Sequence, residues 1–127
     1  MLILVTGATG KVGRNLIARL LEDPRFSGAR VRALCHNRTL DAHDRVEIAR
    51  GSIADRPVAE QALEGVTHVV HLATCKETPA DVMDVTVKGL FWLLEGFRLS
   101  RRARQFILIG GDAGIGHFFY RHDGPIT

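Results

Sequence analysis

Short hydrophobic runs alternate with longer amphipathic segments along most of this 127-residue chain. The short runs are rich in Val, Ile and Leu and predict five strands, at residues 2–5, 30–34, 45–49, 67–72 and 105–109. Apolar residues spaced three and four apart predict helices over 12–21, from Pro57 toward Leu63, and over 80–99. On the long helix, the positions expected to face the core are Val82, Val85, Leu90, Leu93, Leu94 and Phe97. Strands separated by helices predict an α/β fold with a parallel sheet and right-handed crossovers.

A glycine-rich turn, Thr6-Gly7-Ala8-Thr9-Gly10-Lys11-Val12-Gly13, joins the first strand to the first helix. In this context Gly7 permits a tight turn, Gly10 lets a pyrophosphate approach the backbone, and Gly13 lets the helix pack closely on the sheet. The alternative is a plain strand–helix turn without a ligand. The position directly after a strand favours a Rossmann-type, doubly wound parallel sheet of about five strands in the order 3-2-1-4-5. We then expect a dinucleotide in the crevice between strands 1 and 4, at their carboxyl ends.

The candidate cofactor-binding residues come from the segments that follow each strand. The phosphate turn contributes Gly7, Thr9, Gly10, Lys11, Val12 and Gly13, and the end of strand 2 contributes Cys35, His36, Asn37 and Arg38. Ser52 and Ile53 follow strand 3, where we expect the adenine ring, and Leu72, Ala73 and Thr74 follow strand 4.

The end of strand 2 bears on the choice between NAD and NADP. An Asp or Glu there would accept a hydrogen bond from the ribose 2′-hydroxyl and favour NAD. This chain has no acid in the segment 35–38, and Arg32 and Arg38 lie nearby. Because a guanidinium can pair with a 2′-phosphate, the segment weakly favours NADP. The alternative is that Arg32 points to solvent and Arg38 is only a loop charge.

Composition is ordinary for a globular protein, with 46% hydrophobic and 24% charged residues and no visible linker, so residues 1–127 read as one domain. The net charge of +3 suits an anionic ligand. The arginine cluster at 98–104 has no interleaved aromatic residues, so we expect a solvated helix end and no nucleic-acid binding. We expect no membrane span, no signal peptide and no metal site, and we expect Cys35 and Cys75 to be reduced thiols of a cytoplasmic protein.

Several motifs resemble the extended short-chain dehydrogenase/reductase family, the NAD-dependent epimerases and dehydratases. The glycine turn resembles that family's first turn, and Gly51-Ser52-Ile53-Ala54-Asp55 resembles its adenine segment, with Ser52 in place of the usual acid. Val70-His71-Leu72-Ala73 is similar to its strand-4 ending, and Thr86-Val87-Lys88-Gly89-Leu90 to its Asn-Val-x-Gly-Thr helix motif. The resemblance adds Thr86, at the asparagine position, to the candidate cofactor residues. It implies an NAD(P)-binding domain of a protein that acts on a sugar or nucleotide-sugar, as an oxidoreductase or an isomerase.

The resemblance also implies a catalytic Tyr-x-x-x-Lys pair and a serine, which this chain does not match. Gly111 stands at the serine position, with Asp112 beside it, and Tyr120 is followed four residues later by Gly124. We therefore assign no catalytic residue and leave enzymatic activity open. Two interpretations remain. In the first, these residues are the N-terminal part of a longer enzyme, which contains the catalytic helix and substrate region. In the second, the chain is a non-catalytic dinucleotide-binding sensor or regulatory module. The family resemblance further implies a possible homodimer through the 80–99 helix, with an exposed Trp92 at the interface.

Overall fold

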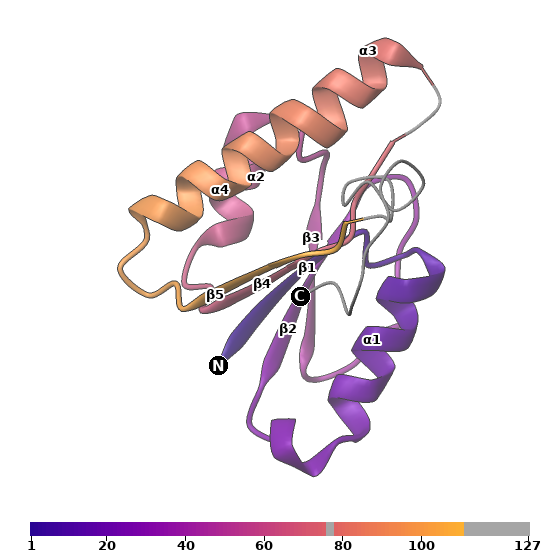
Figure 1. Ribbon diagram of the computed structural model, residues 1–127. Coiled ribbons are helices and arrows are strands. Elements are labelled where there is room, and N and C mark those ends of the chain that lie inside the picture. The colour runs from indigo at the N-terminus through magenta and orange to yellow at the C-terminus, as the bar shows by residue number, and fades with distance from the viewer. Residues whose placement is uncertain (76–77, 111–127) are drawn as a thin grey trace, which may run out of the picture.

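The central feature is a five-stranded parallel sheet, seen in a computed structural model that describes residues 1–75 and 78–110 (Figure 1). Its strands are β1 (Leu2–Thr6), β2 (Arg30–Cys35), β3 (Val46–Arg50), β4 (His68–His71) and β5 (Gln105–Leu108). The order is β3-β2-β1-β4-β5, and every pairing is parallel. The predicted fold class and strand order are confirmed.

Helices cover both faces of the sheet. One face carries α1 (Lys11–Glu22), which is followed by the short 3₁₀ turn η1 (Pro24–Phe26). The other carries α2 (Arg56–Leu63) and a continuous long helix made of α3 (Pro79–Asp81), η2 (Val82–Lys88) and α4 (Gly89–Leu99) (Figure 1). The middle part, η2, is π-helical, which the sequence pattern does not predict. π-Helical turns are rare and occur frequently at functional sites.

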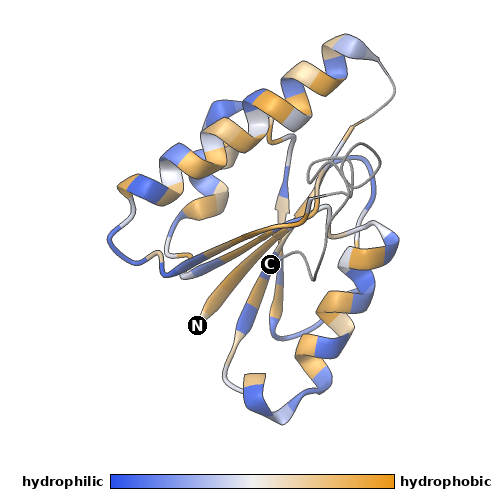
Figure 2. Cartoon of the chain, viewed as in Figure 1, coloured by the Kyte–Doolittle hydropathy of each residue, from blue (hydrophilic) through white to orange (hydrophobic). Residues whose placement is uncertain are grey.

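Two hydrophobic clusters lie on either side of the sheet. Leu4 and Val69 meet Leu93 of α4 on one side, and Val5 and Val31 meet Ile17 of α1 on the other. Figure 2 shows β1 as a mostly hydrophobic strand at the centre of the molecule. Because β1 is covered on both faces, its continuous apolar run fits a central parallel strand.

Two arginines from the sheet region hold the carboxyl ends of helices. Arg32 Nη1 donates to the Ala62 carbonyl at 2.8 Å and the Glu64 carbonyl at 2.7 Å, at the end of α2. The same side chain forms an ion pair with Glu47 of β3. Arg45 similarly donates to the Phe26 carbonyl and to the Leu21 carbonyl at the end of α1. Arg32 is therefore neither solvent-directed nor available to a 2′-phosphate, because it stabilises orphan carbonyls of a helix end.

The long helix has apolar residues along two faces, and only the face that packs toward the sheet is buried. Leu93 is fully buried, and Leu90 and Phe97 are partly buried. Leu94, which was expected to face the core, is 43% exposed, so that expectation is wrong. It lies with Met83, Val87 and Phe91, three further exposed apolar side chains at helical spacing along the outer surface. None of the helices in the described part of the chain is long and apolar enough to cross a membrane.

Candidate functional site

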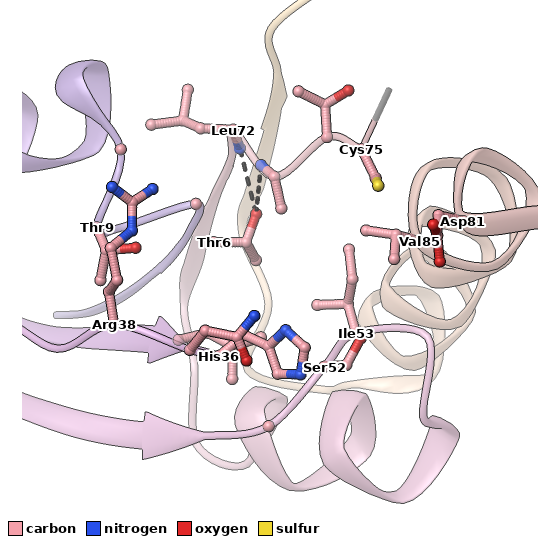
Figure 3. Close-up of a pocket in the computed structure, with 17 residues that line it drawn as sticks. Thr6, Thr9, His36, Arg38, Ser52, Ile53, Leu72, Cys75, Asp81 and Val85 are labelled. Atoms are coloured by element: carbon pink, nitrogen blue, oxygen red, sulfur yellow. Dashed lines mark hydrogen bonds between the residues drawn. The ribbon is translucent and has the colours of Figure 1, made fainter. Parts of the chain in front are cut away.

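A cavity of about 660 Å³ opens at the carboxyl edge of the sheet (Figure 3). Its walls come from the turn after β1, the segments after β2, β3 and β4, and the first turns of the long helix. The lining residues are Thr6, Gly7, Thr9, Gly10, Leu34, His36, Asn37, Arg38, Gly51, Ser52, Ile53, Leu72, Ala73, Thr74, Cys75, Asp81 and Val85. The volume is within the range of pockets that hold cofactors, and the place is the ligand crevice of open parallel sheets.

Close backbone packing explains two of the three glycines in the turn. Gly7 has φ +65°, and a Cβ there would lie 2.7 Å from the Leu72 carbonyl carbon. A Cβ on Gly13 would lie 2.4 Å from the Gly7 carbonyl oxygen, so α1 can pack this closely only without a side chain. Gly10 is less confined, because its Cβ would meet only the Gly7 oxygen, at 3.2 Å. Gly10 lines the cavity directly before α1, whose first-turn N–H groups favour an anion.

Arg14 ties the glycine turn to the loop after β2. Its Nε donates to the Thr9 carbonyl at 3.1 Å, and its Nη2 donates to the Thr39 carbonyl at 3.2 Å. The side chain thereby joins two segments that border the cavity.

A buried network fixes the end of β4 against β1. The Thr6 hydroxyl oxygen accepts from the Leu72 and Ala73 N–H groups, at 3.2 Å each, and lies 2.8 Å from His71 Nδ1. Because these two amides take up its lone pairs, the hydroxyl donates its own hydrogen to Nδ1. His71 is therefore neutral with its hydrogen on Nε2, and burial lowers its pKa below the ordinary value. The network sets the position of Leu72 and Ala73, two cavity residues (Figure 3).

The segments after β2 and β3 form the other end of the cavity. His36, Asn37 and Arg38 follow β2 and line it. Ser52 Oγ accepts from the Ala54 N–H at 3.2 Å, which fixes the turn after β3. Ile53 is buried and packs against the long helix so closely that a Cβ on Gly89 would lie 2.6 Å from its Cγ1.

The structure brings most of the candidate residues to this cavity and leaves five outside its lining. Lys11 and Val12 are exposed at the first turn of α1, and Gly13 lies beneath the turn. Cys35 is buried in the cluster on the α1 side, where desolvation raises the pKa of its thiol. Thr86 does not line the cavity. Its hydroxyl accepts a hydrogen bond from the Cys75 N–H at 3.1 Å and donates one to the Cys75 carbonyl at 3.2 Å. Thr86 thus holds the loop after β4.

The sequence reasoning missed six lining residues: Thr6, Leu34, Gly51, Cys75, Asp81 and Val85. Four of them directly precede or follow a predicted residue: Thr6, Leu34, Gly51 and Cys75. Their positions at the ends of strands were the signal that could have identified them as lining residues. Asp81 and Val85 come from the start of the long helix, which no strand-end rule includes. Gly111, Asp112 and Tyr120 lie outside the described residues. Within residues 1–75 and 78–110, no group of three or more His, Cys, Asp or Glu side chains could hold a metal ion.

Known proteins share both the sequence pattern and this arrangement. The chain is 35% identical over 127 residues to a 3β-hydroxysteroid dehydrogenase/Δ5→4-isomerase of Mycobacterium tuberculosis, a match that covers 98% of the chain and 32% of the relative. An epimerase structure from Methanothermobacter thermautotrophicus superposes with a TM-score of 0.76 at 25% identity, covering 89% of this chain and 36% of that one. The uronate dehydrogenase of Agrobacterium tumefaciens, in a complex with NAD, gives a TM-score of 0.72 at 25% identity over 83% of this chain and 39% of that one.

This chain spans about a third of the length of the curated relatives it matches. The family model for NAD-dependent epimerases and dehydratases matches residues 3–120, nearly the whole chain. On this match, together with the sheet order and the glycine turn, the chain belongs to the NAD-dependent epimerase/dehydratase family.

Proposed function

We propose that this chain is a dinucleotide-binding domain and that its 660 Å³ cavity holds NADP or NAD. The observation that carries the proposal is the glycine turn, which places Gly10 and the start of α1 at the cavity wall. The pyrophosphate lies at Gly10, where its oxygens accept hydrogen bonds from the backbone N–H groups of Lys11 and Val12. The adenosine lies along His36, Asn37 and Arg38 toward Ser52 and Ile53, and Leu72, Ala73 and Thr74 border the nicotinamide half.

The proposal includes a weak preference for NADP. Arg38 lines the cavity directly after β2, and the lining residues from that segment include no acid. A guanidinium there can pair with the 2′-phosphate that distinguishes NADP from NAD. Arg32 no longer supports this preference, because it holds the end of α2. The structural relative in complex with NAD shows that the same fold accepts the other cofactor.

Calorimetric titration of the chain with NADPH and NADH tests both parts of the proposal. We expect both to bind with 1:1 stoichiometry, NADPH about tenfold more tightly, since one charge-assisted pair separates them. Arg38→Gln should remove this difference by lowering the NADPH affinity, with a much smaller effect on the NADH affinity. Arg30→Gln, an exposed arginine at the opposite end of β2, serves as the control. Absence of binding by both cofactors would contradict the proposed function, and tighter binding of NADH would contradict the NADP preference.

Within a longer parent, such a domain serves hydride transfer to or from a substrate carbon, and the bound nicotinamide supplies that chemistry. We propose a sugar or nucleotide-sugar substrate, as in the uronate dehydrogenase relative. The mycobacterial relative, a hydroxysteroid dehydrogenase, supports a hydroxysteroid as an alternative substrate.

The second candidate function is a non-catalytic dinucleotide sensor. It is supported by Gly111 at the serine position and by the absence of a Tyr-x-x-x-Lys pair from these 127 residues.

We further propose that two copies pair through the outer stripe of the long helix. Met83, Val87, Phe91 and Leu94 form that stripe and are all exposed. Trp92, the residue expected at the interface, instead packs toward the core and lies under Arg56, whose guanidinium carbon is 5.1 Å from the ring centroid. A continuous exposed apolar stripe on a helix is typical of a helix-pairing surface.

Sedimentation measures this pairing. We expect the chain to sediment as a dimer at micromolar concentration and Phe91→Glu to sediment as a monomer, because a buried unpaired carboxylate opposes association. Leu99→Glu removes an apolar side chain beyond the stripe that is 66% exposed, against 56% for Phe91, and should leave the dimer intact. A monomeric wild-type chain, or a dimer unchanged by Phe91→Glu, would overturn the pairing.

A further inference from the structure

The residues of the turn after β3 that line the cavity, Gly51, Ser52 and Ile53, include no charged acceptor where the adenine base is expected, and Asp55 of the same turn is not part of the lining. Adenine presents an exocyclic amino group, which is a hydrogen-bond donor and is best recognised by a carboxylate or carbonyl oxygen. Ser52 stands at this turn, and its Oγ already accepts from the Ala54 N–H. Ile53 beside it offers an apolar wall but no acceptor side chain.

A carboxylate reaches the same cavity from a different element. Among the described residues that line the cavity, Asp81 alone carries a carboxylate. It lies in the first turn of the long helix, with Val85 one turn later (Figure 3). In Figure 3, Asp81 and Val85 project from this helix, with Ile53 and Ser52 on the segment beside them. Val85 packs against the hydrophobic cluster that contains Ile53, so Asp81 lines the cavity one helical turn beyond that contact.

The Asp81 side chain is oriented by its neighbour. The Thr78 hydroxyl donates to Asp81 Oδ2 at 2.6 Å, and the Asp81 N–H donates to Thr78 Oγ1 at 3.1 Å. These two bonds fix the first turn of the helix and engage one carboxylate oxygen. Within the described residues no hydrogen bond or ion pair engages Oδ1, so its lone pairs remain for a ligand.

We propose that Asp81 reads the exocyclic amino group of the adenine base and so selects adenine dinucleotides over those with an oxo group at that position. This inference rests on the proposed function, since it needs a dinucleotide in the cavity. Asp81 provides the acidic acceptor that Ser52 does not. A hypoxanthine base replaces the amino donor by a carbonyl oxygen, which a carboxylate repels. Asp81 is therefore a specificity-determining residue for the base and does not touch the reacting atoms.

The test compares NADPH with its nicotinamide hypoxanthine analogue by calorimetry, on the whole chain. We expect the wild type to bind NADPH at least about tenfold more tightly, since a hydrogen bond to a charged group is exchanged for a repulsion. In Asp81→Asn this affinity ratio should fall toward one, because an amide can donate to the oxo group. Asp84→Asn is the matched control: Asp84 lies on the same helix, pairs with Lys88 at 2.8 Å and is absent from the cavity lining. It removes the same charge and should keep the wild-type ratio.

The outcomes separate the two proposals. If both dinucleotides bind and Asp81→Asn leaves their affinity ratio unchanged, the assignment of Asp81 is wrong while dinucleotide binding stands. If Asp84→Asn alters the ratio as much as Asp81→Asn, the effect is one of charge and the assignment is also wrong. If neither dinucleotide binds the wild type, the proposed function itself is wrong and the assignment falls with it. Circular dichroism of each variant confirms that the fold is retained.

Discussion

Gly13→Ala is expected to lower the free energy of unfolding by about 3 kcal/mol or more, the upper end for overpacking a close contact. The added Cβ would lie 2.4 Å from the Gly7 carbonyl oxygen and 2.8 Å from the Ala8 Cα. These are backbone atoms of the turn, so no side chain can rotate away, and α1 must move off the sheet. Urea unfolding followed by circular dichroism measures the change.

Two other glycines serve as comparisons for Gly13. Gly28→Ala should leave stability within about 0.5 kcal/mol, because a Cβ there meets nothing within 4 Å. Gly10→Ala should be better tolerated by the fold than Gly13→Ala, since its nearest contact is 3.2 Å, yet it should weaken dinucleotide binding at the cavity wall. A Gly13→Ala variant as stable as Gly28→Ala would show that the turn is not packed as described.

Thr6→Val is expected to destabilise the fold by a comparable amount, about 3 kcal/mol. The substitution preserves the shape of the side chain but removes the oxygen that accepts from the Leu72 and Ala73 N–H groups. It also removes the donor to Nδ1 of the buried His71. Leaving buried polar groups without partners costs about 1–3 kcal/mol for each group, and part of this is recovered by relaxation. Urea unfolding again provides the measurement.

Thr6→Ser is the matched control for this network. It retains the hydroxyl and loses one methyl group, so it should cost much less than Thr6→Val and preserve the neutral state of His71. Nitrogen-15 shifts of the His71 ring report the tautomer directly, with Nδ1 as acceptor and Nε2 protonated. Equal stability of Thr6→Val and wild type, or a protonated Nδ1 in the wild type, would contradict the network.

Local sequence signals predicted the sheet well because its features are set by short stretches of chain. Apolar runs of strand length separated by helical periodicity imply parallel pairing, and the glycine turn marks β1 as a central strand. The observed strands match the predicted ones to within one residue at each end. The same reasoning placed Gly10, Arg38, Ile53 and Ala73 beside one cavity, since carboxyl ends of parallel strands meet at one edge.

The parts that sequence reasoning missed depend on contacts between distant segments. Asp81 reaches the cavity because the long helix packs on Ile53 at Gly89 and begins about two turns earlier, at the cavity wall, which no local pattern encodes. From the sequence, Arg32 is expected to be an exposed strand residue. In the fold, the carbonyls at the end of α2 lie within hydrogen-bonding distance of its guanidinium. Cys35 follows the strand-end rule, but the alternation of β2 directs its side chain to the α1 face. The long helix carries apolar residues on two faces, so helical periodicity alone does not show that Leu94 belongs to the exposed face.

Amide chemical-shift mapping with NADP is the most direct test that the cavity binds a dinucleotide. On a uniformly nitrogen-15-labelled chain, saturating NADP should shift the amide signals of Gly10, Val12, Arg38, Ile53 and Ala73 together, with one common affinity. Signals at Arg19 and Leu99, away from the cavity lining, should stay unchanged. No shifts at saturating NADP would contradict dinucleotide binding. Shifts confined to the second cleft, which Ile17, Leu21 and Leu40 line between α1 and the loop before β3, would place the ligand elsewhere and contradict the assigned site.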